Sequence, residues 1–236
     1  MSSTSHQSYA SKIGNAQSML LAIQEFPAYV APIPTASPAA LDASITSIQT
    51  LENTLNDAQT AYHVKVQDRQ NVFDTNSNAI DKLLAPIRTF VEAITSDTDA
   101  QYIELNRLIK RIRGAAPKKS TNAINVSAAK KSQVEMTFNS RQHDFGLIIN
   151  ILESLSVPYT PPNADISIPN LIIVKDAAFS STSKVETAQG VLKELTTKRL
   201  DSFKNLTAQC QSIKKFVKAQ YGLHSTEYDR IKSLKI

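Results

Sequence analysis

The strongest constraint in this sequence is a helical pattern that continues for 33 residues. From Leu41 to Phe73 an apolar side chain recurs about every 3.6 positions, which is the period of an α-helix. The run contains no Gly or Pro, and the chain has only five glycines, too few for the tight turns of a compact all-β fold. A helix of this length spans about 50 Å at 1.5 Å per residue. The sequence therefore predicts a bundle of long helices.

The same pattern occurs a second time, 130 positions later. The aligned pairs are Leu41 with Leu171, Ala58 with Ala188, Arg69 with Arg199, and Phe73 with Phe203. At a shift of 126 the match resumes, with FVEA at 90–93 on FVKA at 216–219. The step removes four residues, about one helical turn, which a packed helical hairpin can absorb. A second helix of about 33 residues, ending near Phe203, is therefore expected.

This internal match predicts a tandem duplication. At a shift of 129 the first helix of each half also aligns, with Tyr9 on Phe138. The predicted fold is an all-α, long-helix bundle built from two similar tandem halves with a pseudo-twofold relation. The expected boundaries are 1–114 for the first half, 115–132 for a basic join with the start of the next helix, and 133–236 for the second half.

A proline-rich passage precedes each long helix. These passages are FPAYVAPIPTASP at 26–38 and VPYTPPNADISIP at 157–169. Proline has no amide hydrogen and restricts the residue before it, so neither passage is expected to be helical. We interpret them as matching crossovers over the bundle. The alternative interpretation is a polyproline ligand for an SH3-like partner.

Shorter helices are expected after the long ones. The sequence DTNSN after Phe73 predicts a break before the next helix, and Asp99 and Ser225 suit the N-caps of two short terminal helices. Gly114 suits a helix end. A further helix is predicted from near Ser120 to about Ser156. Carboxylates such as Glu52 are expected at exposed helical positions.

The net charge of +5 is unevenly distributed along the chain. Residues 1–104 have a net charge of −6, residues 105–134 a net charge of +8, and residues 135–236 a net charge of +3. The segment 107–131 contains basic side chains and no acidic one. Its candidate residues for binding an anion or a partner are Arg107, Lys110, Arg111, Arg113, Lys118, Lys119, Lys130 and Lys131.

This basic stretch admits several interpretations. It could be a solvated surface or a protein contact, a site that neutralises the phosphates of nucleic acid, or a site for an anionic membrane surface. Basic side chains near a helix C-terminus also complement the helix dipole without any ligand. No Trp, Phe or Tyr lies between Tyr102 and Phe138, so a platform for base stacking is not evident.

Motifs for catalysis or cofactor binding are missing from the sequence. There is no GxGxxG, GxxxxGK[ST], GxSxG or HExxH, and the four histidines have no ligand spacing toward one another or toward a cysteine. Cys210, the single cysteine, lies on an apolar stripe and is expected to be a buried thiol. Asp97 and Asp99 are expected to act in capping and loop solvation. We therefore expect no catalytic residue, no metal site and no cofactor.

One resemblance adds to this interpretation. The connector YTPPN at 159–163, followed by a long helix and then by FVKAQYG and STEYDRIKSLKI within 216–236, resembles uncharacterised helical proteins of Bacteroidota. The resemblance implies a bacterial, duplicated all-α protein, and it brings no activity or site residues with it.

The expected function is therefore a non-catalytic structural or protein-interaction bundle. The acidic first part of one molecule could dock on the basic middle of another, so that the protein assembles with itself. The alternatives are a nucleic-acid-binding protein that uses 107–131 and a membrane-active protein of the pore-forming type. The sequence shows no signal peptide and no transmembrane helix, so a cytoplasmic location is expected.

Overall fold

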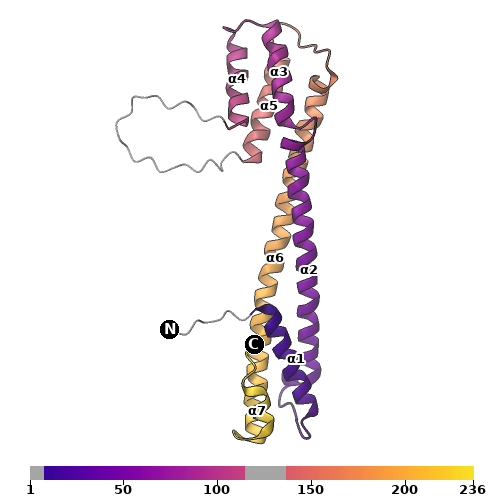
Figure 1. Cartoon of the computed structure of the whole chain (residues 1–236), viewed down its shortest axis with the longest axis vertical. Helices are drawn as coiled ribbons and strands as arrows, with labels where there is room; N and C mark the ends of the chain where they lie inside the picture. Colours follow the sequence, from indigo (N-terminus) through magenta and orange to yellow (C-terminus); the bar gives the residue numbers. More distant parts are fainter. Residues whose placement is uncertain (1–7, 115–136) are drawn as a thin grey trace, which may run out of the picture. The chain divides into compact units, whose positions relative to one another are not determined.

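The described structure consists of helices. A computed structural model describes residues 8–114 and 137–236, and these residues form helices, turns and connectors but no strand (Figure 1). The prediction of an all-α protein is therefore confirmed. The chain divides into two compact units. Unit 1 combines Met1–Thr60 with Gly190–Ile236, and unit 2 is formed by Ala61–Gln189.

Unit 1 contains parts of both ends of the chain. Its elements are α1 (Tyr9–Glu25), the short 3₁₀ turn η1 (Pro34–Ala36), the first part of α2 (Pro38–Gln70), the last part of α6 (Ile168–Tyr221), and α7 (Thr226–Lys232). One apolar cluster joins these helices, and its members include Met19, Ile23, Leu41, Ile45, Phe203, Ile213 and Ile231. Full burial of such a side chain contributes about 2 kcal/mol, so this cluster is the main source of the unit's stability.

Unit 2 is formed by a continuous stretch of chain. Its elements are the end of α2, a π-helical turn η2 (Asn71–Thr75), α3 (Ile80–Ile94), α4 (Ala100–Ile112), α5 (Phe138–Ser154), the 3₁₀ turn η4 (Ala164–Ile166), and the start of α6. Helices α3, α4 and α5 lie side by side in this unit (Figure 1). They bury a second apolar cluster, which includes Phe73, Leu84, Ile87, Leu105, Leu108, Phe145 and Ile148.

Polar side chains define where four of the helices begin. The Asp99 carboxylate accepts hydrogen bonds from the amides of Gln101 and Tyr102 at the start of α4, and the Ser225 hydroxyl accepts one from the amide of Tyr228 at the start of α7. Both predicted N-caps are confirmed. The side chains of Ser8 and Thr137 act in the same way before α1 and α5.

The two proline-rich passages lie mostly outside the long helices, as predicted, but each contains one 3₁₀ turn, and their last residues, Pro38 and 168–169, already belong to α2 and α6. In each passage a tyrosine hydroxyl donates a hydrogen bond to the backbone carbonyl of the residue seven positions later. The Tyr29 hydroxyl donates to the carbonyl of Ala36 at 2.8 Å, and the Tyr159 hydroxyl donates to the carbonyl of Ile166 at 2.9 Å. These hydrogen bonds satisfy connector carbonyl groups that no helix pairs.

The second long helix differs from its prediction. A helix of about 33 residues ending near Phe203 was expected, but α6 continues for 54 residues from Ile168 to Tyr221. In the first half, α2 does have 33 residues, and η2 with a short break separates it from α3. After Phe203 the sequence has no proline and no counterpart of DTNSN to interrupt the helix, so α6 continues to Tyr221.

Helix α5 also differs from its prediction at its start. A helix from near Ser120 to about Ser156 was expected, but α5 begins at Phe138. Thr137 has ψ near 145°, which is not helical, and its hydroxyl accepts a hydrogen bond from the amide of Ser140. A continuous helix through this residue is therefore wrong, because the cap requires an extended backbone. The rest of the predicted segment lies outside the described residues.

The compact units do not coincide with the predicted halves 1–114 and 133–236. Unit 1 takes α1 and the start of α2 from the first half, and the end of α6 and α7 from the second. Unit 2 takes the remaining elements of both halves. The reason is that α2 and α6 are each long enough to contribute residues to both units.

Candidate functional site

The predicted basic stretch is described only in its first part. Arg107, Lys110 and Arg111 lie on α4, and Arg113 is its C-cap residue. Gly114 follows with a positive φ of 69°, so this glycine ends the helix as predicted. The other four candidate residues, Lys118, Lys119, Lys130 and Lys131, lie outside the described residues.

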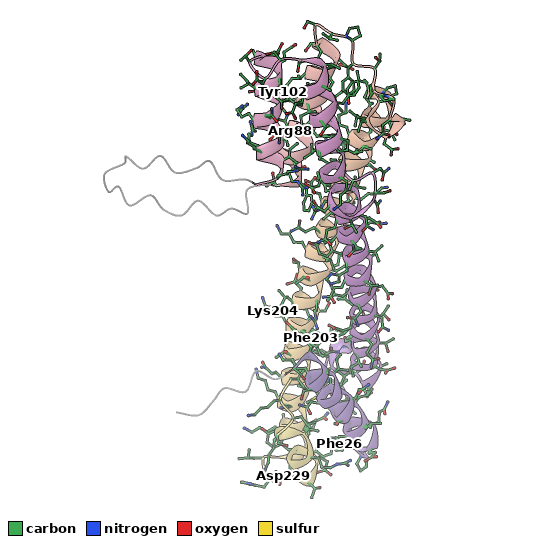
Figure 2. The ribbon with its side chains drawn as sticks, turned by 45° about the horizontal axis from the view of Figure 1, so that its top comes forward. Phe26, Arg88, Tyr102, Phe203, Lys204 and Asp229 are labelled. Carbon is green, nitrogen blue, oxygen red and sulfur yellow. The ribbon has the colours of Figure 1, made fainter. Side chains whose placement is uncertain are left out.

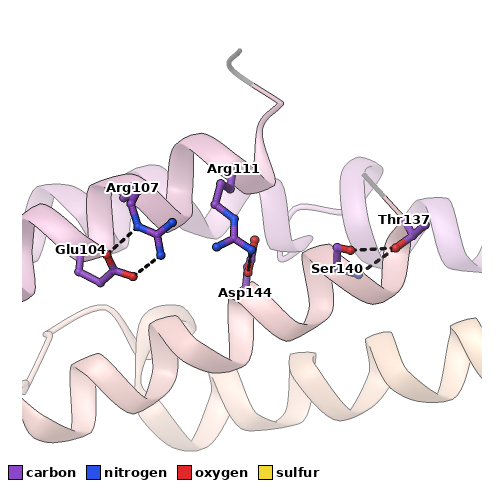
Figure 3. Close-up of polar contacts among 6 residues, drawn as sticks. All are labelled: Glu104, Arg107, Arg111, Thr137, Ser140 and Asp144. Atoms are coloured by element: carbon purple, nitrogen blue, oxygen red, sulfur yellow. Dashed lines mark hydrogen bonds and ion pairs between the residues drawn. The ribbon is translucent and has the colours of Figure 1, made fainter. Parts of the chain in front are cut away.

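Arg107 forms an ion pair within its own helix. Its Nε donates to Oε2 of Glu104 at 2.7 Å, and its Nη2 donates to Oε1 at 2.6 Å, which is a two-point contact between residues three apart (Figure 3). The hydrogen bonds from Arg107 lower the pKa of Glu104, and the same contact raises the pKa of Arg107. Both side chains remain close to water, so the contact orients Arg107 more than it stabilises the fold.

Arg111 contacts a carboxylate on another helix. Its Nη2 lies 2.8 Å from Oδ1 of Asp144 on α5, and the side chain of Asp144 is only 4% exposed (Figure 3). The N–H groups do not point at the oxygen well enough for a directed hydrogen bond, so this is an ion pair by distance. A buried carboxylate needs an opposite charge, and Arg111 supplies it.

Sequence reasoning did not anticipate the role of Asp144. The sequence alone predicted no role for this residue, although Asp144 precedes the core residue Phe145 and lies four positions before the core residue Ile148. Asp144 is spaced along the helix so that it shares a face with core residues. This spacing is the signal that indicates a buried carboxylate with a cationic partner.

Arg113 joins the end of α4 to the start of α3. Its Nε lies 3.5 Å from Oδ1 of Asp81, and its Nη2 donates to the backbone carbonyl of Asp81 at 3.3 Å. Lys110 is exposed, and no ion pair of Lys110 occurs among residues 8–114 and 137–236. Three of the four described candidates are therefore paired inside unit 2, and the expected cluster of unpaired cations is reduced to Lys110 in this part of the chain.

Unit 1 contains Arg199, one of the two arginines that align in the internal match. The Arg199 guanidinium lies 3.9 Å from the centre of the Tyr9 ring and forms a two-point ion pair with Glu52, at 2.5 Å and 2.7 Å. Glu52 was expected to be exposed, but its side chain is only 22% exposed because it packs against this guanidinium. The expectation for Glu52 was therefore wrong.

Unit 2 contains a comparable contact. The Arg69 guanidinium lies 3.9 Å from the centre of the Phe138 ring. Nearby, Arg141 pairs with Asp74 at 2.5 Å, and its guanidinium lies 5.2 Å from the centre of the Phe73 ring. Cations over aromatic faces are held by the ring quadrupole, and their stems cover apolar surface. These arginines act in packing.

Each unit has a hollow on its described surface. In unit 2, a hollow of about 300 Å³ lies between α2 and α6 and includes Lys65, Ser180 and Lys184 in its lining. In unit 1, a hollow of about 240 Å³ lies beside Cys210 and Lys214. The Lys214 ammonium donates to the backbone carbonyl of Lys232, the last residue of α7, and to that of Leu234 just after the helix, so its charge is used to hold this segment.

Cys210 is buried, as predicted. Its side chain is 1% exposed, and desolvation raises the pKa of its thiol to about 12, against the smaller opposing effect of Lys214. Burial also lowers the pKa of Lys214. A thiol with such a pKa is protonated near neutral pH, which disfavours a role as a nucleophile.

Residues 8–114 and 137–236 contain neither a cluster of metal ligands nor a membrane-spanning helix. No group of three or more His, Cys, Asp or Glu side chains in these ranges is arranged to hold a metal ion. Within the same ranges, no helix combines the length and the apolar character needed to cross a membrane. Comparisons with protein-family models, with curated proteins and with solved structures find no match.

Proposed function

We propose that this protein is a non-catalytic helical bundle that acts through protein contacts, and that it assembles with itself through charged surfaces. The observation that carries the proposal is that charged side chains of this protein pair with one another between helices. Arg111, Arg141 and Arg199 each bind a carboxylate and so hold helices together. In enzymes, such groups instead converge on a cavity, with a nucleophile or base beside them.

The proposal includes a duplicated origin for the chain. Arg69 over Phe138 and Arg199 over Tyr9 have the same distance of 3.9 Å, and their sequence offsets are 130 and 129. The tyrosine contacts of the two connectors also recur at an offset of 130. Two compact units with equivalent contacts are what a copied ancestral unit would give. A pseudo-twofold relation between the halves remains a prediction.

The alternative of nucleic-acid binding through 107–131 receives less support. Arg107, Arg111 and Arg113 each have a carboxylate partner, and a phosphate would have to compete with it. Asp144 is buried, so its separation from Arg111 would leave an unpaired charge in the core of unit 2. A cytoplasmic location and a bacterial source also remain predictions.

Sedimentation velocity of the full chain tests the proposal. At roughly 0.02 M salt the protein is expected to sediment as assemblies, and at roughly 0.5 M salt it is expected to dissociate, because the Debye length shrinks over this range. A monomer at both salt concentrations, at all protein concentrations used, would contradict the proposed self-assembly.

A further inference from the structure

A row of lysines lies on the exposed side of α6 in unit 1. Lys193, Lys204 and Lys215 are spaced by 11 residues, which is close to three helical turns, and Lys218 follows one turn later. All four side chains are exposed. In Figure 2, Lys204 projects from α6 on the side away from α2. We call these four residues the lysine stripe.

The stripe is mainly free of carboxylates. The positions between its lysines on the same face are Thr197, Leu200, Ala208 and Gln211. In the described part of unit 1, the neighbouring acidic side chains of Glu194 and Glu52 pair with Lys198 and Arg199 instead. The stripe lysines form no ion pair among the described residues. One exposed carboxylate, Asp201, lies about one turn before Lys204, so the stripe presents a net positive face, not an unbroken one, to a partner.

A complementary surface lies at one end of unit 2. The segments 89–106 and 142–174 contain no Lys or Arg, and they carry the exposed carboxylates Asp97, Glu153 and Asp165. We call these three residues, with the segments around them, the acidic end.

Two contacts bring the segments of the acidic end together. The Gln101 side-chain amide, at the start of α4, donates to the carbonyl of Ser154 at the end of α5 at 3.0 Å. The rings of Phe90 and Tyr159 meet edge to face, with their centres 5.3 Å apart. These contacts place the three carboxylates on neighbouring elements.

We propose that the lysine stripe of one molecule docks on the acidic end of a second copy. This inference rests on the proposed function and names the surfaces through which self-assembly occurs. Each surface also exposes an apolar side chain: Leu200, in the stripe, is 54% exposed, and Val157, at the acidic end, is 42% exposed. The contact therefore combines opposite charges with a small apolar centre.

A second copy suits the stripe better than nucleic acid does. The stripe contains lysines without arginine, and no aromatic side chain lies on its face, so neither two-point phosphate recognition nor base stacking has a residue to carry it. The same chain supplies a surface of the opposite charge. Because the two surfaces differ, the contact is head to tail and leads to a ring or an open chain of copies.

Paired charge reversals test the inference. The first variant is Lys204→Glu with Lys215→Glu, and the second is Glu153→Lys with Asp165→Lys. Each variant alone brings like charges together, so its self-association at low salt should weaken at least tenfold relative to wild type. An equimolar mixture of the two restores opposite charges at both possible contacts, and it should sediment as assemblies again.

The control is Lys82→Glu with Lys198→Glu, which makes the same charge change at exposed positions outside both surfaces. It should associate like wild type. If the two test variants associate as strongly as wild type, or if their mixture does not form assemblies again, the two named surfaces are wrong. Self-assembly itself would not be contradicted by either result. Binding of duplex DNA that is lost in Lys204→Glu with Lys215→Glu, with self-association unchanged, would also overturn the two named surfaces.

Discussion

Arg107 and Arg111 lie one turn apart on α4 and are both about half exposed, but their partners differ. Glu104 is close to water, whereas the side chain of Asp144 is 4% exposed. Removal of Arg107 frees a carboxylate that water can solvate. Removal of Arg111 leaves a carboxylate buried without a cation, which costs much more free energy.

We therefore expect Arg111→Ala to lower the free energy of unfolding by about 2 kcal/mol, a value below the usual range for buried pairs because Arg111 is itself half exposed. Arg107→Ala, the matched control, should produce no measurable change. Urea denaturation followed by circular dichroism measures both. Addition of Asp144→Asn to Arg111→Ala should recover part of the loss, and equal losses in the two single variants would contradict the prediction.

The buried thiol of Cys210 gives a pH-dependent prediction. Its pKa is about 12 in the folded protein and ~8.5 in an unfolded chain, so between these values only the unfolded state releases the proton. The free energy of unfolding therefore falls as pH rises through this window, by up to about 1.4 kcal/mol per pH unit.

The measurement is urea denaturation at about pH 8 and about pH 10. Cys210→Ala is expected to be less stable than wild type at the lower pH because it leaves a small cavity. Between the two conditions its free energy of unfolding should fall by about 2 kcal/mol less than that of wild type, since it has no thiol to titrate. If the free energy of unfolding falls by the same amount in both proteins, the thiol is not buried in the way that the structure indicates.

Some of these residue roles could be read from the sequence and others could not. The caps at Asp99 and Ser225 and the helix end at Gly114 depend on local backbone geometry, which short motifs encode. The pairing of Arg111 with Asp144 depends on which helices face each other. That choice is made by tertiary packing, which spacing along one helix does not reveal.

At the scale of single helices, two glycines give opposite predictions. Gly190 lies inside α6, and a Cβ there would meet nothing within 4 Å, so Gly190→Ala should raise the free energy of unfolding by about 0.5–1 kcal/mol. Gly222 follows α6 with a φ of 98°, so Gly222→Ala should lower it by about 1 kcal/mol. Thermal unfolding of both variants checks the prediction, and a shift of the same sign in both would contradict it.

The helices themselves were largely predictable, because apolar spacing and proline position specify them. The length of α6 was not. Its predicted end near Phe203 came from analogy with the first half, where the chain has residues for η2 and a break. A helical pattern on both sides of a junction does not indicate whether the chain bends there, so the continuation of α6 to Tyr221 could not be predicted from the pattern.

At the scale of the whole molecule, the composition of unit 1 leads to a prediction about fragments. Residues 1–60 supply Leu41 and Ile45 to its core, and residues 190–236 supply Phe203 and Ile213. Neither predicted half contains both sets. A fragment of 1–114 therefore exposes apolar surface that the intact chain buries.

We expect separately produced fragments 1–114 and 133–236 not to form folded monomers, and we expect their mixture to gain helix. Far-ultraviolet circular dichroism of each fragment and of the mixture, with sedimentation to determine mass, checks this outcome. A stable, fully helical monomer from either fragment would mean that the halves fold independently. Lys198→Glu, a change at an exposed position outside both apolar clusters, should leave the gain on mixing unchanged.

The division of the sequence between the two units also sets an order for synthesis. All residues of unit 2 have been made when the ribosome reaches Gln189, so its helices can pack while translation continues. At that point residues 1–60 lack the segment of α6 and the helix α7 on which they pack in unit 1, because Gly190–Ile236 has not yet been translated. The apolar side of α1 and the start of α2 must therefore be kept from aggregating until the last 47 residues, Gly190–Ile236, emerge.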